Sequence, residues 1–452
     1  MVMETLSYRI TLRATKFLNI ILVTIPVLLA WWCFYKSTDG LYSNWKPLCL
    51  VFCAFTILYI TYGRIYKAFY ISIARISEMV YSQCLALIMS DGLLYAVLCL
   101  VSRKFLAVYP LCLALIAQML LSALWCIVAH KWYFKTYPPK KTVIVYDRDE
   151  NVDLLIGAYG LHKKFYIVRS VCVAQCVDNE RDTLQGVKTV FLYGVHSHER
   201  NRILKFCVEQ DITAYVLPRI GDIIMSGGKY INLFHLPFFR VDRYEPKPEY
   251  LFFKRLFDIV ISALALLVLS PVMLVTAAAV KLSDGGPVFY KQKRLTKNRK
   301  EFNVIKFRSM RQDAEKDGVA RLSTGETDTR ITPVGRVIRK LRVDELPQLF
   351  NILGGSMSIV GPRPERPEIA IQYEKELPEF SLRLQAKAGL TGYAQVYGKY
   401  NTTPYNKLQL DLIYIAHPSF FEDLRIIFAT IKILFLREST EGIAEGMENA
   451  IK

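Results

Sequence analysis

The sequence predicts a membrane protein of mixed architecture: four transmembrane helices, then a small α/β domain, then a mainly helical C-terminal domain. Three observations lead to this fold class. Four long apolar stretches occupy the first 130 residues, and short strand-like runs alternate with helical ones after them. A fifth apolar stretch, interrupted by Ser270 and Pro271, opens a C-terminal part that is rich in lysine and arginine.

The overall composition agrees with a membrane protein. The 452 residues are 52% hydrophobic and carry a formal net charge of +18. High apolarity with a strong positive charge is expected of a protein set in a bilayer with most of its polar mass on the cytoplasmic side. A basic nucleic-acid-binding protein would share the charge but not the apolar stretches. The ten cysteines form no CxxC pair and no His/Cys zinc spacing, so we expect reduced, buried thiols.

The predicted transmembrane domain covers residues 1–135. Its apolar stretches run over residues 17–35, 47–63, 83–101 and 105–128, each near the ~20 residues that a helix needs to cross hydrocarbon. Basic residues lie before the first stretch, between the second and third, and after the fourth. The positive-inside rule therefore places the N-terminus and everything after residue 130 in the cytoplasm. Because no signal-peptide cleavage site follows the first stretch, we expect it to be a retained anchor.

Residues 136–248 are predicted to form a small α/β (Rossmann-like) domain with a parallel sheet. "TVIVYD" and "TVFLYGV" are short β-branched and aromatic runs, whereas "HERNRILKFCVEQD" has helical spacing. A dinucleotide-binding fold requires glycines after its first strand so that the backbone can approach a pyrophosphate. This chain has "VYDRDENVD" there instead. We therefore expect a structural, regulatory or dimerising domain rather than a cofactor-binding one.

The C-terminal domain, residues 249–452, begins with an apolar stretch over about residues 256–282. Ser270 and Pro271 lie near its middle, where proline breaks or kinks a helix and the serine hydroxyl can bind the freed carbonyl. A kinked fifth transmembrane helix is one interpretation. Lysines and arginines flank the stretch on both sides, however, and only a re-entrant hairpin keeps both flanks in the cytoplasm. We therefore predict a re-entrant membrane helix.

A basic segment follows, and its "VIKFRSM" portion differs from an ordinary solvated charge run. Lys306 and Arg308 alternate with Ile305 and Phe307, as on a half-buried strand. Cations on the buried side of a strand need a partner anion, and phosphate is the obvious candidate. The segment therefore predicts an anion-binding site.

Two adjacent carboxylates, Asp344 and Glu345, lie in "PVGRVIRKLRVDELPQLFNIL", which we interpret as a helix opened by Pro333 with an apolar stripe facing the core. Neighbouring acidic residues are usually just a solvated face. Here the preceding turn is densely basic, so we expect the field to lower both pKa values and keep the pair ionised. An ionised carboxylate can serve as a nucleophile, and two hard oxygen ligands suit Mg²⁺ together with substrate phosphates.

Two further motifs follow the carboxylates. In "SIVGPRPERP", prolines on both sides fix the backbone of Arg363, as a bidentate phosphate clamp requires. "AGLTGYAQVYG" supplies three glycines and Gln395, although its glycines alone are typical of a turn connector.

With these pieces in order, residues 250–436 resemble the bacterial sugar transferase family, the monotopic polyprenyl-phosphate hexose-1-phosphate (phosphoglycosyl) transferases. The matching stretches are collinear: the Ser270-Pro271 break, "GPVFYKQKR", "KFRSM", "DELPQLFNILGGSMSIVGPRPE", "GLTGYAQVYG" and "KLQLDLIYI". The four N-terminal helices and the α/β domain resemble the large, multi-domain branch of that family, although the middle domain lacks the glycine-rich fingerprint usual there.

The resemblance implies an enzyme that moves a sugar-1-phosphate from a UDP-sugar to polyprenyl (undecaprenyl) phosphate and releases UMP. This would be the first membrane step of exopolysaccharide, capsule or O-antigen assembly, at the inner (plasma) membrane of a bacterium with the catalytic domain in the cytoplasm. By family likeness Asp344 is the nucleophile that forms a phosphoaspartyl-sugar intermediate, and Glu345 holds Mg²⁺. The expected phosphate-binding residues are Lys306, Arg308, Arg363, Gln395 and Asp411. Expected partners are the UDP-sugar, the polyprenyl phosphate, the bilayer and a second copy in a homodimer, but no nucleic acid.

Two other interpretations stay open at this point. A polytopic phosphoglycosyl transferase would place catalytic aspartates among the N-terminal helices, but Asp91 is the only acidic residue in those apolar stretches. A non-enzymatic membrane-anchored regulator or scaffold would explain the charge and the anchors, but not the ordered set of Lys306, Asp344, Glu345 and Arg363. Release of nucleoside monophosphate from a donor sugar separates an enzyme from a scaffold.

The re-entrant topology predicts where a label reaches the chain just after the fifth apolar stretch. A cysteine introduced at Ser283, in a variant without other cysteines, is expected to react with a membrane-impermeant maleimide only from the cytoplasmic face of sealed vesicles. Reaction from the opposite face would show that the fifth helix crosses the membrane.

Overall fold

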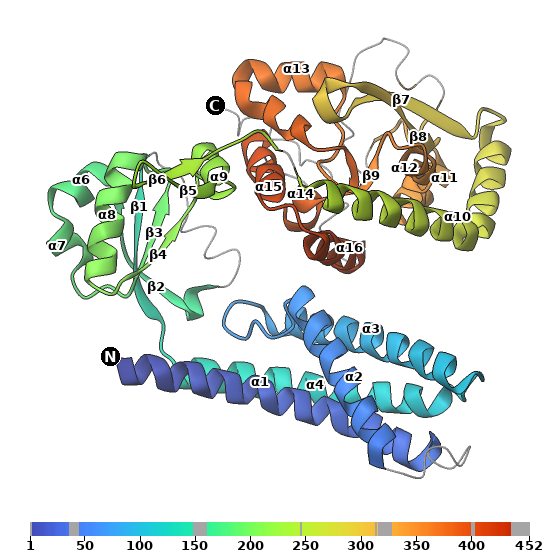
Figure 1. Cartoon of the computed structure of the whole chain (residues 1–452), viewed down its shortest axis with the longest axis horizontal. Helices are drawn as coiled ribbons and strands as arrows, with labels where there is room; N and C mark the ends of the chain where they lie inside the picture. Colours follow the sequence, from blue (N-terminus) through green and yellow to red (C-terminus); the bar gives the residue numbers. More distant parts are fainter. Residues whose placement is uncertain are drawn as a thin grey trace. The chain divides into compact units, whose positions relative to one another are not determined.

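The computed structural model describes residues 2–35, 45–147, 161–244, 246–311, 314, 328–398 and 403–434. The chain divides into two compact units, Met1–Leu217 and Pro218–Lys452. It is mostly helical, with small sheets, and Figure 1 labels its elements along the sequence. The finer three-part division at residues 135 and 248 stays a prediction.

The first unit begins with four long helices and continues with alternating strands and helices. Its elements are α1 (Val2–Ala30), the π-helical turn η1 (Trp31–Tyr35), α2 (Trp45–Ile65), α3 (Ile76–Ser102), α4 (Tyr109–Thr136), β1 (Lys140–Tyr146), η3 (Leu161–Lys163), β2 (Phe165–Cys172), α6 (Val173–Asp178), α7 (Glu180–Leu184), β3 (Thr189–Tyr193), α8 (Ser197–Glu209) and β4 (Thr213–Val216). Among the described residues of the whole chain, five helices are long and apolar enough to cross a membrane, and four of them lie here.

The interior of the four long helices contains polar side chains. The Tyr59 hydroxyl of α2 contacts Asn19 Oδ1 of α1 at 2.6 Å and Gln83 Oε1 of α3, and all three residues are buried. Large apolar side chains such as Leu100 and Leu120 are instead exposed. Polar groups inside and apolar groups outside is the arrangement that a lipid environment favours.

The predicted parallel sheet is present in the first unit. Its four strands follow the order β2-β1-β3-β4, and every neighbouring pair is parallel. Alternate residues of β1 and β3, Val143, Val145, Val190 and Leu192, pack into one apolar core with residues of α8 such as Ile203. In β1 the residues from Thr142 to Val145 are all buried, as is typical of an inner strand of a parallel sheet, and the short β-branched run predicted from the sequence agrees with this.

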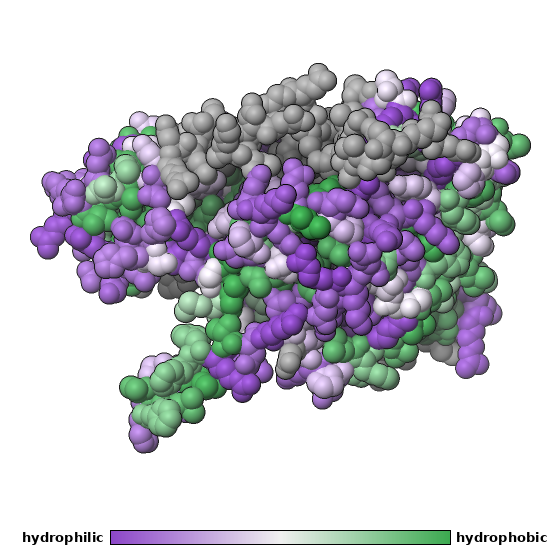
Figure 2. Space-filling model, turned by 90° about the horizontal axis from the view of Figure 1, so that it is seen from above, coloured by the Kyte–Doolittle hydropathy of each residue, from purple (hydrophilic) through white to green (hydrophobic). Residues whose placement is uncertain are grey.

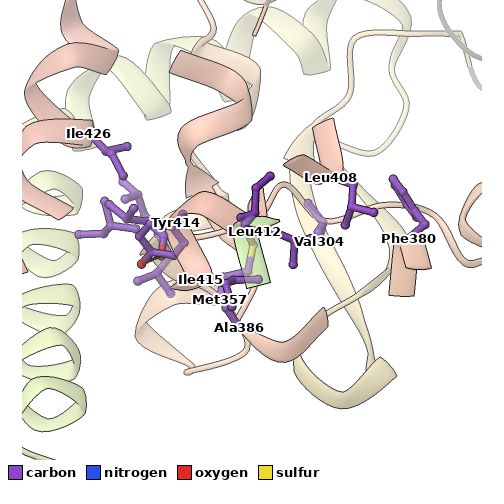
Figure 3. Packing of buried hydrophobic residues seen from close by; sticks show 14 residues of the cluster. Val304, Met357, Phe380, Ala386, Leu408, Leu412, Tyr414, Ile415 and Ile426 are labelled. Atoms are coloured by element: carbon purple, nitrogen blue, oxygen red, sulfur yellow. Dashed lines mark hydrogen bonds between the residues drawn. The ribbon is translucent and has the colours of Figure 1, made fainter. Parts of the chain in front are cut away.

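The second unit is a compact α/β assembly around a long helix. Its elements are α9 (Ile220–Ser226), β5 (Lys229–Leu233), β6 (Leu236–Arg240), α10 (Pro248–Asp284), β7 (Phe289–Leu295), η4 (Lys297–Arg299), β8 (Glu301–Phe307), α11 (Pro333–Lys340), η6 (Val343–Glu345), α12 (Gln348–Leu353), β9 (Ser358–Val360), α13 (Pro367–Glu376), η7 (Pro378–Gln385), β10 (Gly389–Thr391), α14 (Tyr393–Tyr397), α15 (Pro404–Ala416) and α16 (Phe420–Leu434). Figure 3 shows Val304, Met357 and Leu412 in its buried apolar core.

The fifth apolar helix, α10, is continuous across Pro271 and changes direction along its length (Figure 1). Proline has no N–H to bond the carbonyl four residues earlier, which belongs to Leu267. The Ser270 hydroxyl donates to that carbonyl at 2.8 Å, so the predicted compensation by serine is present. Side chains such as Leu267, Val268 and Leu274 are exposed on this helix. Hydrophobic residues reach the molecular surface in several patches between hydrophilic ones (Figure 2).

The first turns of α10 are tied to two short segments of the same unit. The Arg255 guanidinium donates to the carbonyls of Ile352 and Leu353, at 2.6 and 2.7 Å, and so caps the C-terminus of α12. The Asp258 carboxylate accepts the N–H of Ile359 in β9 at 3.0 Å. One end of the apolar helix therefore fixes both α12 and β9.

The predicted helix over the basic segment and the carboxylates is wrong in its extent. Helix α11 ends at Lys340, Arg342 takes the left-handed conformation with φ 53°, and Asp344 and Glu345 lie in the separate short helix η6. A left-handed residue cannot continue a right-handed helix. The apolar stripe also faces the core only in part, since Ile338 is buried while Leu341 is 66% exposed.

Three glycines let the backbone of the parallel β9 and β10 segments approach at close range. A Cβ on Gly389 or Gly392 would overlap the backbone of Gly361, and a Cβ on Gly361 would overlap the carbonyl of Lys387. Only glycine permits such an approach. The two glycines of "GLTG" therefore allow the segment that leads to Arg363 to pack directly against β10. This packing role goes beyond that of a simple turn.

Candidate functional site

Four residues predicted from the sequence meet at one point of the second unit. Lys306 is near the end of β8, Asp344 and Glu345 are in η6, and Arg363 lies in the irregular segment after β9. One carboxylate oxygen of Glu345, Oε1, contacts Lys306 Nζ at 3.3 Å and accepts a hydrogen bond from Arg363 Nη2 at 2.9 Å. Side chains up to 57 positions apart in the chain are thus joined through one oxygen atom.

A pocket opens between three of these side chains, and Asp344 lies in the same short helix as one of them, Glu345. Lys306, Glu345 and Arg363 line the pocket together with Arg294 and the backbone of Gly389, among others. Three cations and one carboxylate around one small pocket give it a positive character. Such a pocket suits an anionic ligand with several oxygen atoms, since lysine and arginine are the usual ligands of phosphate.

The two neighbouring carboxyl groups have opposite electrostatic surroundings. Burial alone would raise the pKa of Glu345, but the charges of Arg363 and Lys306 outweigh burial and hold this pKa well below its usual range. Burial raises the pKa of Asp344 to about 6, and the negative charge of Glu345 acts in the same direction. The sequence-based expectation that both pKa values are lowered is therefore wrong for Asp344, because burial and the charge of Glu345 outweigh the nearby cations there.

Asp344 is the carboxylate that stays available for chemistry. Among the described residues it makes no hydrogen bond or ion pair, and Lys306, Arg339 and Arg363 act on it only through the field of their charges. A carboxylate without a bound cation keeps its lone pairs free to attack an electrophile. A pKa near neutrality still leaves it mostly ionised at pH 7.

The site fits a magnesium ion by the chemistry of its donors. The described part of the chain holds no group of three or more His, Cys, Asp or Glu side chains that would form an all-protein metal site. Mg²⁺ instead commonly takes one or two carboxylates and completes its shell with water and substrate phosphates. Asp344 and Glu345 supply two such carboxylates, and the contacts of Glu345 with Lys306 and Arg363 use only one of its oxygens.

The other predicted phosphate-binding residues lie elsewhere. Arg308 is buried and pairs with Asp284 at the end of α10. The Gln395 side-chain amide donates to the carbonyl of Leu390 in β10 at 3.5 Å, and Gln395 is not among the residues that line the pocket. Asp411 is buried in an ion pair with Arg383, with 2.6 Å between Asp411 Oδ2 and Arg383 Nη2. The structure brings none of the three into contact with Glu345.

Arg294 is a pocket residue that the sequence interpretation missed. Its Nη1 donates to the carbonyl of Pro364 at 2.9 Å, and its Nε and Nη2 donate to Gln292 Oε1 at 3.1 and 2.7 Å. Burial lowers the pKa of Arg294 to about 10. The signal was the alternation within "KQKRL": Gln292 and Arg294 share one face of β7, whereas Lys291 and Lys293 belong to the opposite one.

The sequence of this region matches a known family model. The model described as "Bacterial sugar transferase" matches residues 249–437, which include every residue of the site.

Individual relatives agree with that match. The chain is 37% identical over 239 residues to a protein of Aeromonas hydrophila named UDP-N-acetylgalactosamine-undecaprenyl-phosphate N-acetylgalactosaminephosphotransferase, covering 52% of this chain and 55% of the relative. It is 43% identical over 182 residues to the UDP-glucose:undecaprenyl-phosphate glucose-1-phosphate transferase of Xanthomonas campestris pv. campestris, covering 39% of this chain and 37% of the relative. With the exopolysaccharide production protein PSS of Rhizobium leguminosarum bv. phaseoli it shares 43% identity over 187 residues, or 39% of this chain and 92% of the relative. The matched region thus spans about half or less of the first two relatives and almost all of the third.

The opposite pKa shifts predict opposite effects of the two carboxylates on stability. Because the folded protein raises the pKa of Asp344 from 3.8 to about 6, ionising this group destabilises the fold as pH rises through that interval. The variant Asp344→Asn should therefore unfold at a higher temperature than the wild type above about pH 6, and the difference should vanish below about pH 4. Glu345 has a lowered pKa, so Glu345→Gln should be less stable than the wild type above about pH 4.5 and lose this deficit as pH falls.

Thermal unfolding of the purified protein between pH 2 and 8 measures both effects, because the deficit of Glu345→Gln begins to shrink only below about pH 4.5. A difference between Asp344→Asn and the wild type that stays constant across this range would contradict the raised pKa.

Proposed function

The chain belongs to the bacterial sugar transferase family, and from this premise we propose that it transfers a sugar-1-phosphate from a UDP-sugar to polyprenyl (undecaprenyl) phosphate and releases UMP. Relatives named for N-acetylgalactosamine and for glucose support a UDP-hexose or UDP-N-acetylhexosamine as the proposed donor class. A role in the assembly of a cell-surface polysaccharide is part of this proposal, and relatives named for exopolysaccharide production support it.

One observation carries the assignment of roles within the site. Glu345 is engaged by Lys306 and Arg363, whereas the adjacent Asp344 has no partner among the described residues. A carboxylate held by two cations is a poor nucleophile, and a free one beside them is a good one. We therefore assign the attack to Asp344 and the organisation of the surrounding charge to Glu345.

The proposed reaction proceeds in two displacements at the same phosphorus. An Asp344 carboxylate oxygen attacks the phosphorus that bears the sugar, and the bond from that phosphorus to the bridging oxygen breaks as UMP leaves. This gives a phosphoaspartyl-sugar. A phosphate oxygen of the polyprenyl phosphate then attacks this phosphorus, forms the lipid-linked diphosphate and frees Asp344. Two displacements with two different acceptors let one pocket serve a soluble donor and a lipid acceptor in turn.

Lys306, Arg363 and Arg294 are the residues that we propose to bind the phosphate oxygens. All three line the pocket. Negative charge moves to the leaving UMP during the first displacement, and fixed cations lower the free energy of that transition state without having to reorganise. Arg308, Gln395 and Asp411 are left out of this set because their side chains are engaged elsewhere.

We propose Mg²⁺ as the cofactor, held by the second carboxylate oxygen of Glu345, which Lys306 and Arg363 do not contact. Bound there, the ion would neutralise charge on the donor diphosphate. Removal of divalent metal with a chelator should stop UMP release, and added Mg²⁺ should restore it. Full activity in excess chelator would contradict this role.

The proposed setting is the bacterial inner (plasma) membrane. We propose that α1–α4 cross the bilayer, that α10 enters and returns at its Ser270-Pro271 bend, and that the pocket faces the cytoplasm. Exposed apolar side chains along α10 and cations near both of its ends, such as Arg255 and Lys281, support this arrangement. The homodimer stays a prediction.

The assigned nucleophile gives a direct test of the function. Wild-type protein in membranes should release many UMP molecules per enzyme only when polyprenyl phosphate is supplied, and without it release should stop at about one UMP per enzyme. Asp344→Asn should lower this rate by at least about a thousandfold while the protein stays folded, because the attacking oxygen is lost. As a control, Glu368→Gln removes a carboxylate that is 64% exposed on α13 and should leave the rate within about twofold. Substantial turnover by Asp344→Asn would remove it as nucleophile.

A further inference from the structure

The segment that carries Arg363 is held at every carbonyl. Residues 362–365 form no regular secondary structure, and two of the four are prolines without an N–H. Four consecutive carbonyls nevertheless each accept a hydrogen bond from a different donor. The pairs are Gly389 N to Pro362 O at 2.9 Å, Arg383 Nη2 to Arg363 O at 2.9 Å, Arg294 Nη1 to Pro364 O at 2.9 Å, and Leu295 N to Glu365 O at 3.0 Å.

The donor to the carbonyl of Arg363 itself is a second, fully buried arginine. Arg383 is 2% exposed and lies with its guanidinium over the ring of Phe380, 4.9 Å from the ring centroid. Its Nε and Nη2 donate to Asp411 Oδ2 at 2.8 and 2.6 Å. The same Nη2 reaches Arg363 O, so one planar group bridges the carboxylate on α15 and the backbone of the site. A guanidinium can make these contacts together because its donors are fixed in one plane.

Asp411 supplies the charge that makes this arrangement stable. A buried guanidinium without a counter-ion carries a large desolvation penalty, and the Asp411 carboxylate, 1% exposed, lies directly against it. Glu365 adds a weaker contact, with Oε1 at 3.5 Å from Arg383 Nη1. A buried carboxylate already bonded to arginine, at this position, would repel a phosphate rather than bind it.

We propose that Arg383 and Asp411 are positioning residues for Arg363. They fix its main-chain carbonyl and thereby hold its guanidinium on Glu345 and toward the transferring phosphate. The predicted effect on the rate of UMP release rests on the proposed function. The predicted effect on the rigidity of the Arg363 segment does not depend on any reaction. It also gives Asp411 a role different from the phosphate binding expected from the sequence.

A matched control exists in the same unit. Lys254 and Asp423 form another buried ion pair, with 2.8 Å between Nζ and Oδ2, and Asp423 is 4% exposed. Their hydrogen-bond partners are the hydroxyls of Tyr250 and Tyr414. The Tyr414 hydroxyl also donates to the carbonyl of Val360 at 3.4 Å, but none of these four side chains contacts residues 362–365. Asp423→Asn therefore breaks a second largely buried pair, with Lys254 13% and Asp423 4% exposed, that does not bind residues 362–365.

A double-mutant cycle tests the kinetic consequence. Arg383→Lys keeps the charge but cannot bridge Asp411 and the Arg363 carbonyl, and Asp411→Asn removes the counter-ion. Each should lower kcat for UMP release on the order of tenfold to a hundredfold, as expected for a misplaced catalytic cation. In an Arg363→Ala background the same substitutions should cost less than about twofold, whereas Asp423→Asn should cost the same factor in both backgrounds. Equal losses from Arg383→Lys with and without Arg363, or no loss at all, would overturn the proposal.

Hydrogen exchange tests the structural consequence without any reaction. A peptide covering residues 359–367 contains the amides of Gly361, Arg363 and Glu365, and these should exchange faster in Arg383→Lys and Asp411→Asn but not in Asp423→Asn. Unchanged exchange in both site variants would overturn the proposal. If Asp411→Asn does not fold, Asp411→Glu, which keeps the charge and displaces it by one methylene, takes its place with the same criteria. Absence of UMP release by the wild type would refute the proposed function. The hydrogen-exchange result would then be the test of the positioning role.

Discussion

One oxygen atom of Glu345, shared by Lys306 and Arg363, is the contact on which the site depends. Three buried or half-buried charges would each be unstable alone, because transfer from water costs more than any single hydrogen bond returns. Together they compensate one another and join β8, η6 and the segment after β9. Because both cations make their strongest contacts with Glu345, the adjacent Asp344 has no partner among the described residues. Burial raises the pKa of Asp344 to about 6. Two chemically similar neighbours thereby acquire different roles.

The scaffold around this contact consists largely of side chains that bind backbone carbonyls. Arg383 and Arg294 hold the carbonyls of Arg363 and Pro364. Arg255, in the first turns of the apolar helix α10, holds the last carbonyls of α12, the helix that follows the two carboxylates. The helix proposed to enter the membrane is therefore also a structural support of the pocket.

Much of this could be predicted from local patterns. Apolar length identified the long helices, and Ser270 compensates the carbonyl freed by Pro271 as expected. The meeting of Lys306, Glu345 and Arg363 followed from residue type and family resemblance. The helix break at Arg342 did not, because its left-handed backbone is imposed by tertiary structure. The alternation of residues along β8 also could not show that Lys306 lines the pocket and Arg308 does not. Arg308 lies just beyond the end of the strand and pairs with Asp284. The raised pKa of Asp344 depends on burial, which composition cannot show.

The central claim is that Asp344 becomes covalently linked to the transferred group, and mass spectrometry of this residue tests it most directly. Purified protein incubated with UDP-glucose or UDP-N-acetylgalactosamine and Mg²⁺, but without polyprenyl phosphate, should gain the mass of the corresponding sugar phosphate on the peptide that contains Asp344. The adduct should be absent in Asp344→Asn and should disappear when polyprenyl phosphate is added. An active enzyme that never carries this adduct, or that carries it on Glu345, would contradict the account.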